Sequence, residues 1–324
     1  MAKVSIVVPI YGVERYIERC ARSLFEQTFD DIEYIFVNDC TKDDSIDILQ
    51  TVIEEYPQRK EQIKILHHPE NRGLPQARKT GILAAKGDYV INFDSDDWVD
   101  IRAIEILYNK ASQDATDIVI CDIYTTDGKK HVIFKCGEDG LGKWTIFDLM
   151  CQMKISWSAC NKLIKRTLFA EVTYPICNNA EDMALILQLI AKAETISYTS
   201  QPLYYYYTNP HSMTKKLTEM QVLKNIEDRN TNNEIVFNVL KQVMPSGKYY
   251  KFVEMFKWQT KKLAWGIIEI DKKHYKYWKS LHSEINLSLF FNRYITIEDK
   301  IKYLLTILRI YPRKRDLEVG KKNS

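Results

Sequence analysis

Apolar residues in the first hundred positions form short runs separated by stretches of helical spacing. The runs occupy residues 4–8, 34–37, 63–66 and 89–93, and they are rich in valine, isoleucine, phenylalanine and tyrosine. Between the runs, apolar residues recur every three or four positions, as on one face of an amphipathic helix. Strands that alternate with helices build βαβ units, so the pattern predicts an α/β fold with an open, mostly parallel sheet flanked by helices.

The pattern changes near residue 215. Residues 99–215 still combine strand-like runs with helical stretches, whereas residues 216–324 show only long helical patterns with many lysines and aromatic residues. We therefore expect one domain over residues 1–215, with halves that meet near residue 98, and a helical C-terminal region over residues 216–324.

The fourth apolar run ends at a group of carboxylates. Residues 87–98 read GDYVINFDSDDW, so Asp94, Asp96 and Asp97 follow the run almost without interruption. Three anions this close repel one another unless a cation lies among them, and hard divalent cations take oxygen ligands and bridge to substrate phosphates. Ligands of open α/β sheets bind outside the carboxyl ends of the strands. The stretch therefore indicates a Mg²⁺ or Mn²⁺ site that binds phosphate, with a solvated acidic turn as the alternative.

Composition narrows the class of protein further. The 324 residues are 45% hydrophobic, which suits a globular protein of one large or two modest domains. Neither G-x-x-x-x-G-K-[ST] nor G-x-G-x-x-G occurs, so the sequence has no P-loop and no dinucleotide-binding fingerprint. The seven cysteines are scattered without a C-x-x-C pair, which indicates reduced thiols in a cytosolic protein.

The excess of positive charge lies at the C-terminus. The last sixteen residues hold six lysines and arginines against two acids, although the whole chain carries only +3. Just before them, apolar residues recur at helical spacing: Ile297, Ile301, Leu304, Leu305 and Leu308. An apolar helix face followed by basic residues can bind an anionic membrane, and docking of the helix on the rest of the protein is the alternative. No stretch is long and apolar enough to span a bilayer, so we expect a cytoplasmic protein, with peripheral contact at the inner face of the cell membrane as an option.

Four stretches, taken together, resemble the family 2 glycosyltransferases of the nucleotide-diphospho-sugar (GT-A) fold. They read SIVVPIYGVERYI, VNDCTKDDS, NRGLPQARKTGILAAKGDYVINFDSDD and AEDMAL, and they occur in the order typical of the family. The chain departs from the family pattern at Gly12, where the family has asparagine. It departs again at Asn38, Cys40 and Thr41, where the family has V-D-D-G-S. The resemblance covers about residues 1–215.

The resemblance implies a GT-A-like catalytic domain in which residues 1–98 bind the nucleotide and residues 99–215 bind the acceptor. It implies an inverting glycosyltransferase that moves a sugar from a UDP-sugar, with Mn²⁺ or Mg²⁺, to a hydroxyl of a glycan or lipid-linked acceptor. Such an enzyme would serve bacterial surface polysaccharide synthesis, without a nucleic-acid partner. A non-catalytic nucleotide- or glycan-binding protein on the same fold is one alternative. A metal-dependent phosphotransferase is another, although haloacid-dehalogenase-like enzymes place their acids after the first strand, where this chain has Pro9 and Tyr11.

The resemblance assigns the nucleotide to residues near the ends of the first strands. Pro9 and Tyr11 would pack against the base. Asp39 would accept a hydrogen bond from the uracil N–H, and a helix N-cap is the alternative. Arg78 would bind the diphosphate as a fixed cation, and an exposed charge on a helix is the alternative.

The acidic stretch would complete the donor site. Asp94, with Ser95 beside it, would hold the ribose, and Asp96 would hold the metal that neutralises the leaving diphosphate. His211 would approach the metal or the diphosphate, although a loop histidine is more often structural or solvated.

The acceptor side would be formed by residues of the second half. Glu181 and Asp182 resemble the family's E-D pair, in which the aspartate is the general base that deprotonates the acceptor hydroxyl. Ordinary acids at a helix N-terminus are the alternative for this pair. Trp157 would stack against an acceptor sugar, with a place in the core as its alternative.

Overall fold

The computed structural model describes residues 2–208, 218–270 and 272–309 of the chain. The chain forms two compact units, Met1–Ser212 and Met213–Ser324. The predicted boundary near residue 215 falls in the segment 209–217, which lies outside the described residues.

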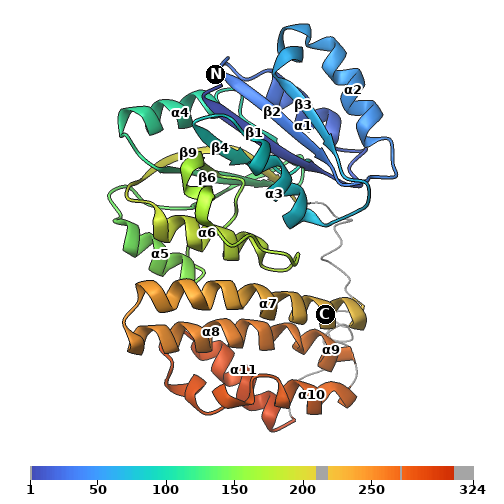
Figure 1. The fold of residues 1–324 in the computed structure, drawn as a ribbon. Helices are drawn as coiled ribbons and strands as arrows, with labels where there is room; N and C mark the ends of the chain where they lie inside the picture. The colour runs from blue at the N-terminus through green and yellow to red at the C-terminus, as the bar shows by residue number, and fades with distance from the viewer. Residues whose placement is uncertain (1, 209–217, 271, 310–324) are drawn as a thin grey trace. The chain divides into compact units, whose positions relative to one another are not determined.

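The first unit is built on one sheet (Figure 1). Within its described residues, nine strands pair in the order β3-β2-β1-β4-β8-β6-β9-β5, with β7 beside β6. The strands are β1 (Val4–Ile10), β2 (Ile32–Asn38), β3 (Ile63–His67), β4 (Tyr89–Asn92), β5 (Trp98–Val99), β6 (Ile118–Thr126), β7 (His131–Phe134), β8 (Lys162–Lys165) and β9 (Ile196–Tyr207). The pairs β1–β2, β1–β4, β2–β3 and β6–β9 are parallel, and β4–β8, β5–β9, β6–β7 and β6–β8 are antiparallel. The predicted α/β fold is confirmed, and its parallel strands are concentrated in the N-terminal half.

Helices separate the strands as the alternating pattern predicts. They are α1 (Ile17–Phe25), α2 (Ser45–Glu55), α3 (Leu74–Ala84), α4 (Ala103–Gln113), α5 (Lys143–Cys151) and α6 (Glu181–Lys192), with short 3₁₀ helices η1 (Pro57–Gln62) and η2 (Arg166–Glu171). Every residue of β1 is buried, which explains its continuous apolar run. Gly81 lets α3 pack directly on β1, because a Cβ atom there would lie 2.3 Å from Cγ1 of Val7. This packing places the start of α3 beside the carboxyl ends of β1, β2 and β4, which share one edge of the sheet.

The second unit is helical, as predicted for the C-terminal region. Its helices are α7 (Glu219–Val243), α8 (Ser246–Leu263), α9 (Trp265–Ile270), α10 (Tyr275–Ser280) and α11 (Ile297–Ile307), with short 3₁₀ helices η3 (Lys272–His274), η4 (Ser283–Ile285) and η5 (Ser288–Phe291). Its core contains Trp258, Trp278 and Tyr303, whose rings lie 5.4–5.5 Å apart where they touch Tyr303. Among the described helices, none combines the length and the apolar character needed to cross a membrane.

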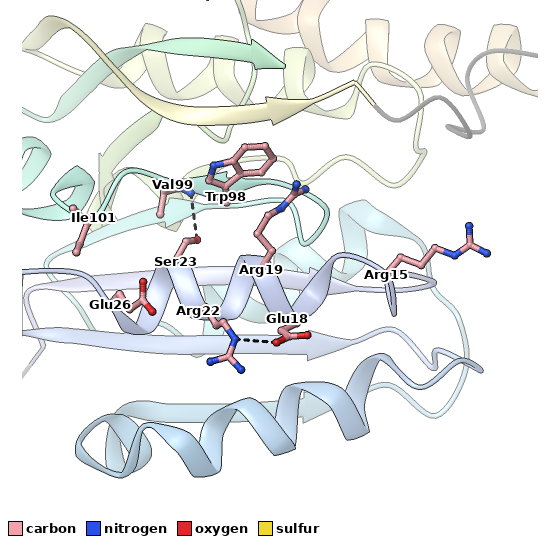
Figure 2. A pocket seen from close by; sticks show the side chains of 9 residues that line it. All are labelled: Arg15, Glu18, Arg19, Arg22, Ser23, Glu26, Trp98, Val99 and Ile101. Carbon is pink, nitrogen blue, oxygen red and sulfur yellow. Dashed lines mark hydrogen bonds and ion pairs between the residues drawn. The ribbon is translucent and has the colours of Figure 1, made fainter. Parts of the chain in front are cut away.

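A hollow of about 510 Å³ lies beside α1 in the first unit. Figure 2 shows Arg19 and Trp98 side by side on its wall, with the guanidinium carbon of Arg19 3.7 Å from the centre of the Trp98 ring. Nη2 of Arg19 also donates a hydrogen bond to the backbone carbonyl of Asp96 at 2.9 Å. Arg19, on the wall of this hollow, therefore stabilises the backbone of the acidic stretch through its hydrogen bond and its contact with Trp98.

Candidate active site

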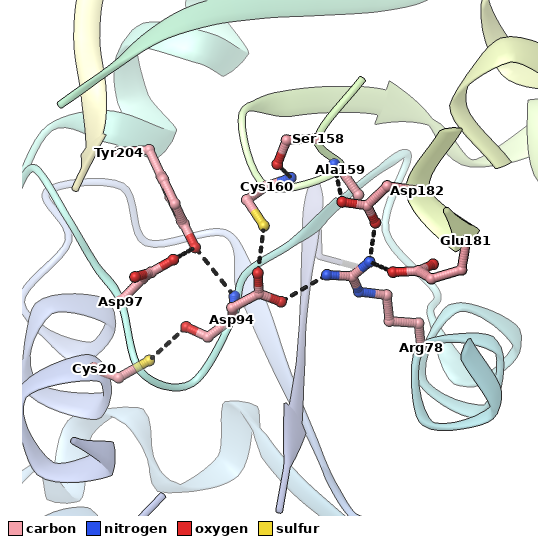
Figure 3. Close-up of polar contacts among 10 residues, drawn as sticks. All are labelled: Cys20, Arg78, Asp94, Asp97, Ser158, Ala159, Cys160, Glu181, Asp182 and Tyr204. Carbon is pink, nitrogen blue, oxygen red and sulfur yellow. Dashed lines mark hydrogen bonds and ion pairs between the residues drawn. The ribbon is translucent and has the colours of Figure 1, made fainter. Parts of the chain in front are cut away.

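The acidic stretch lies where β4 ends, and α3 and α6 contribute side chains to the same place (Figure 3). Arg78 is at the centre of the group, and its side chain is only 2% exposed. Its Nη1 donates hydrogen bonds to the carboxylates of Glu181 and Asp182. Its Nη2 donates to Oδ1 of Asp94 at 2.6 Å. One buried guanidinium on α3 thus joins the end of β4 to the N-terminus of α6.

The position of Arg78 settles one of its two sequence interpretations. The interpretation of Arg78 as an exposed charge on a helix is wrong, because its guanidinium is buried and paired with three acidic side chains. Binding of a diphosphate by Arg78 stays a prediction, and it requires the guanidinium to exchange or share at least one of these carboxylates.

The pKa values of the two acids at the start of α6 are shifted in opposite directions. Burial opposes ionisation of Asp182, but the Arg78 guanidinium, a hydrogen bond from Glu181 and one from the Ala159 amide outweigh burial and lower the pKa of Asp182. Burial and the neighbouring negative charge of Asp182 raise the pKa of Glu181 well above its usual range. These opposite shifts favour the negative charge on Asp182 over Glu181, as expected when adjacent carboxyl groups share one charge.

Asp94 is held on both carboxylate oxygens. Oδ1 accepts from Arg78, and Oδ2 accepts from the Cys160 thiol at 3.0 Å. Burial and the nearby Asp94 raise the pKa of Cys160 well above its usual range, so the thiol remains a donor. Although it is fixed, the Asp94 side chain stays 28% exposed and can contact a ligand.

The other two acids of the stretch have different surroundings. Asp97 is buried, and its carboxylate accepts hydrogen bonds from the Tyr204 hydroxyl and from the Tyr207 amide, the latter at 2.7 Å. Asp97 therefore ties the stretch to β9. The side chain of Asp96 is half-buried, and burial together with the charge of Asp94 raises the pKa of Asp96 to about 6. A carboxylate strained by burial and by a neighbouring anion suits a cation as its partner.

The fit of a divalent metal rests on Asp96. In the described part of the chain, no group of three or more histidine, cysteine, aspartate or glutamate side chains is arranged to hold a metal ion. A Mg²⁺ ion, however, usually keeps several waters and is bound by one or two carboxylates plus substrate phosphates. One carboxylate such as Asp96 would be enough for a site of this kind, and its role as a metal ligand stays a prediction. The predicted contribution of His211 lies outside the described residues.

Asp39 has a defined role in the fold. Its buried carboxylate accepts hydrogen bonds from the amides of Arg72 at 2.9 Å and Gly73 at 2.8 Å, and pairs with Nδ1 of His68 at 2.7 Å. The alternative of a helix N-cap is wrong, because the N-cap position of α2 is Asp44. Each carboxylate oxygen accepts up to two hydrogen bonds, so one position on Oδ2 remains for the predicted uracil contact.

The remaining predicted residues lie at this edge or near it. Pro9 is buried near the end of β1, and Tyr11, just after the strand, is 50% exposed. Ser95 is buried within the acidic stretch. Trp157 is half-buried in the segment that leads to β8, so it is not a fully buried core residue. Their contacts with nucleotide or acceptor stay predictions.

Lys162 is a residue of this region that the sequence pattern did not indicate. It is fully buried at the start of β8, and burial lowers its pKa to about 8. Its ammonium group donates to the carbonyl oxygens of Ser156 at 3.0 Å and Ser158 at 2.7 Å. The third hydrogen bond goes to Oδ1 of Asn161 at 2.8 Å. Lys162 therefore shapes the segment whose Ala159 amide contacts Asp182.

Comparisons with known proteins agree with this geometry. Residues 5–176 match the model of the family described as Glycosyl transferase family 2. The uncharacterized glycosyltransferase EpsJ of Bacillus subtilis is 34% identical over 65% of this chain and 63% of its own length. A poly(ribitol-phosphate) beta-glucosyltransferase of Bacillus spizizenii is 31% identical over 63% of this chain and 32% of its own length. The chain thus spans less than two thirds of these relatives.

A solved structure shows the same fold over almost the whole chain. It is residues 1–349 of S. aureus TarS in complex with UDP, which is 16% identical, with a TM-score of 0.69. The match covers 99% of this chain and 91% of that one. At this identity the likeness concerns the fold alone.

Proposed function

Because the chain belongs to glycosyl transferase family 2, we propose that it is an inverting glycosyltransferase that uses a UDP-sugar. The acceptor would be a hydroxyl of a glycan or of a lipid-linked precursor, and the product a bacterial surface polysaccharide. The observation that carries the proposal is the position of Asp182 at the start of α6, where it accepts a hydrogen bond from the same Arg78 guanidinium that binds Asp94. The name of the poly(ribitol-phosphate) beta-glucosyltransferase relative supports a polymer with free hydroxyl groups as the acceptor class.

Asp182 would act as the general base. A sugar hydroxyl is a weak nucleophile at neutral pH, and a positioned base contributes about 10²–10⁴-fold to such a step. The acceptor oxygen would bond to the anomeric carbon as the bond from that carbon to the diphosphate oxygen breaks, and the hydroxyl proton would pass to Asp182. Glu181, whose raised pKa favours the protonated form, would donate a hydrogen bond beside it.

The donor would bind along the edge formed by β1, β2 and β4. The exposed Tyr11 ring and the remaining acceptor position on Asp39 suit a base, and Asp94 suits a ribose hydroxyl. The complex of TarS with UDP supports a uridine nucleotide as the ligand of this fold. Asp96 would hold Mn²⁺ or Mg²⁺, which when bound neutralises charge on the leaving diphosphate.

A thermal-shift experiment tests donor and metal together. UDP and Mn²⁺ added together should raise the unfolding midpoint clearly more than the sum of their separate effects, because a ligand that binds only the folded state stabilises it. Asp96→Asn should remove this synergy. Asp88→Asn is the matched control, because Asp88 is an exposed acid whose side chain pairs with Lys3. If UDP raised the unfolding midpoint equally with and without Mn²⁺, and equally in the parent and in Asp96→Asn, the proposed donor site would be contradicted.

Release of UDP from a panel of UDP-sugars distinguishes an enzyme from a binding protein. A transferase should release UDP slowly with water as the acceptor and faster with its glycan acceptor. Tight binding of UDP and Mn²⁺ without any release from the panel would favour the non-catalytic alternative.

A further inference from the structure

The aliphatic face of α11 points away from the core of the second unit. Ile297, Ile301, Leu304 and Leu308 are exposed by 76%, 53%, 46% and 57%. Their spacings of four, three and four residues place them along one side of the helix, here called the α11 stripe. Contiguous exposed apolar side chains on a soluble protein mark an interaction surface.

The inward face of α11 explains this orientation. Tyr303 is buried, and its ring packs against the rings of Trp258 at 5.5 Å and Trp278 at 5.4 Å. Asp299 accepts hydrogen bonds from Nε1 of Trp258 at 3.1 Å and from Nζ of Lys262 at 3.0 Å. These contacts fix the rotation of the helix, so the α11 stripe remains on the surface of its unit.

We propose that the α11 stripe docks on an anionic membrane surface. The helix ends at Ile307, and residues 309–324 contain six lysines and arginines against two acids. An apolar helix face followed by basic residues binds such a surface by two additive effects, burial of aliphatic side chains at the acyl boundary and attraction to anionic headgroups. Contact with a membrane would bring the protein to lipid-linked acceptors, but it does not depend on the transfer reaction.

A second copy of the chain fits the α11 stripe less well. Specific protein interfaces bury roughly 1,200–2,000 Å² in total, which exceeds what four aliphatic side chains on each of two short helices can supply. In a symmetric pair that joins the two stripes, the basic segments that follow each helix would also repel one another. A membrane supplies both the apolar layer and the negative charge.

Vesicle sedimentation of the full chain tests the proposal. The protein should sediment with vesicles of phosphatidylcholine mixed with phosphatidylglycerol, less with phosphatidylcholine alone, and less at high salt. The double variant Ile301→Gln, Leu304→Gln should bind the anionic vesicles at least about tenfold more weakly, because two of the four aliphatic anchors are lost. The control Leu83→Gln, Met220→Gln removes two other exposed apolar side chains, 66% and 78% exposed, and should bind like the parent.

Three results would each overturn the proposal. The first is equal sedimentation of parent and stripe variant, or none by either. The second is a parent dimer in light scattering that the stripe variant converts to a monomer, which would assign the surface to a second copy. The third is a stripe variant whose unfolding midpoint falls by several degrees while the control is unchanged, because that would show the stripe packed against the protein itself. UDP binding, measured in parallel, reports on the proposed function independently of all three.

Discussion

The buried arginine at the candidate active site makes a quantitative prediction for stability. We expect Arg78→Met to destabilise the first unit far more than Arg22→Met, although both arginines pair with carboxylates. The side chain of Arg78 is 2% exposed, whereas that of Arg22, which pairs with Glu18 and Glu55 on the surface, is 33% exposed. Removing one partner of a buried ion pair costs about 3–5 kcal/mol because the charges left behind stay buried. An exposed pair contributes about 0–1 kcal/mol.

These free energies translate into unfolding midpoints. In a domain of 150–250 residues, a loss of about 1 kcal/mol lowers the midpoint by roughly 2–4 °C. Arg78→Met should therefore lower the midpoint of the first unit by roughly 6–20 °C, and Arg22→Met by at most about 4 °C. Differential scanning calorimetry measures both. A decrease for Arg78→Met no larger than that for Arg22→Met would refute the idea that this guanidinium compensates buried charges.

The loss of stability in Arg78→Met should also depend on pH, and the direction of that dependence distinguishes uncompensated charge from lost packing. The pKa of Asp182 is lowered in the parent, so the stability that Asp182 contributes is present above its unfolded pKa of about 3.9 and is lost as the pH falls through the lower folded pKa. In Arg78→Met the buried carboxyl groups lack the guanidinium and take up protons at higher pH. The difference between variant and parent should therefore shrink as the pH is lowered from about 7 to about 5. A difference that widens over that range would point to lost packing instead of uncompensated charge.

Two further predictions concern turnover. Asp182→Asn should lower transfer by about 10²–10⁴-fold and keep UDP and Mn²⁺ binding within a small factor, and turnover within tenfold of the parent would show that Asp182 has another role. Lys162→Met should lower transfer per folded protein, because the segment beside Asp182 loses its three hydrogen bonds to the ammonium. Lys261→Met is its matched control, since the buried Lys261 donates to two backbone carbonyls and the amide oxygen of Asn286 in the other unit. Equal loss of transfer in both lysine variants would mean that Lys162 acts only through stability.

Of the first four strands, β1, β2 and β4 could be predicted because burial on both faces leaves a continuous apolar run, whereas β3 is only partly buried. β1 is buried at every position, and β2 at five of its seven. β8 gives no such signal, because its four residues read KLIK and the burial of Lys162 depends on carbonyl oxygens contributed by a loop. β5 has only two residues, too few for any periodicity to appear. Both missed strands pair by contacts that are distant in sequence.

The candidate site was predictable as a set of residues but not as a network. Residue type and motif indicated Asp94, Glu181 and Asp182 as functional acids, and the fold brings them together. Their common partner could not be found by spacing, because Arg78 lies 103 and 104 residues before the two acids of α6. The spacing of apolar residues on α3 does not predict that an arginine of this helix is buried. Its burial follows from the close packing of α3 on β1, which Gly81 permits.

The acidic stretch shows why neighbouring residues of one type need not share one function. The sequence suggested that three crowded anions call for one cation, but the structure gives each a different partner. Asp94 accepts a hydrogen bond from Arg78, a cation that it shares with Glu181 and Asp182, and Asp97 accepts hydrogen bonds from the Tyr204 hydroxyl and the backbone of β9. Asp96 differs from Asp97 in its exposure, because its side chain is half-buried whereas Asp97 is buried, although burial and neighbouring acids raise the pKa of both. The physical argument for a metal therefore does not rest on the number of acids in the stretch. It rests on Asp96, whose pKa is raised by burial and by the charge of Asp94 and whose half-buried side chain can still contact a ligand, which is why Asp96 is the position at which to test metal binding.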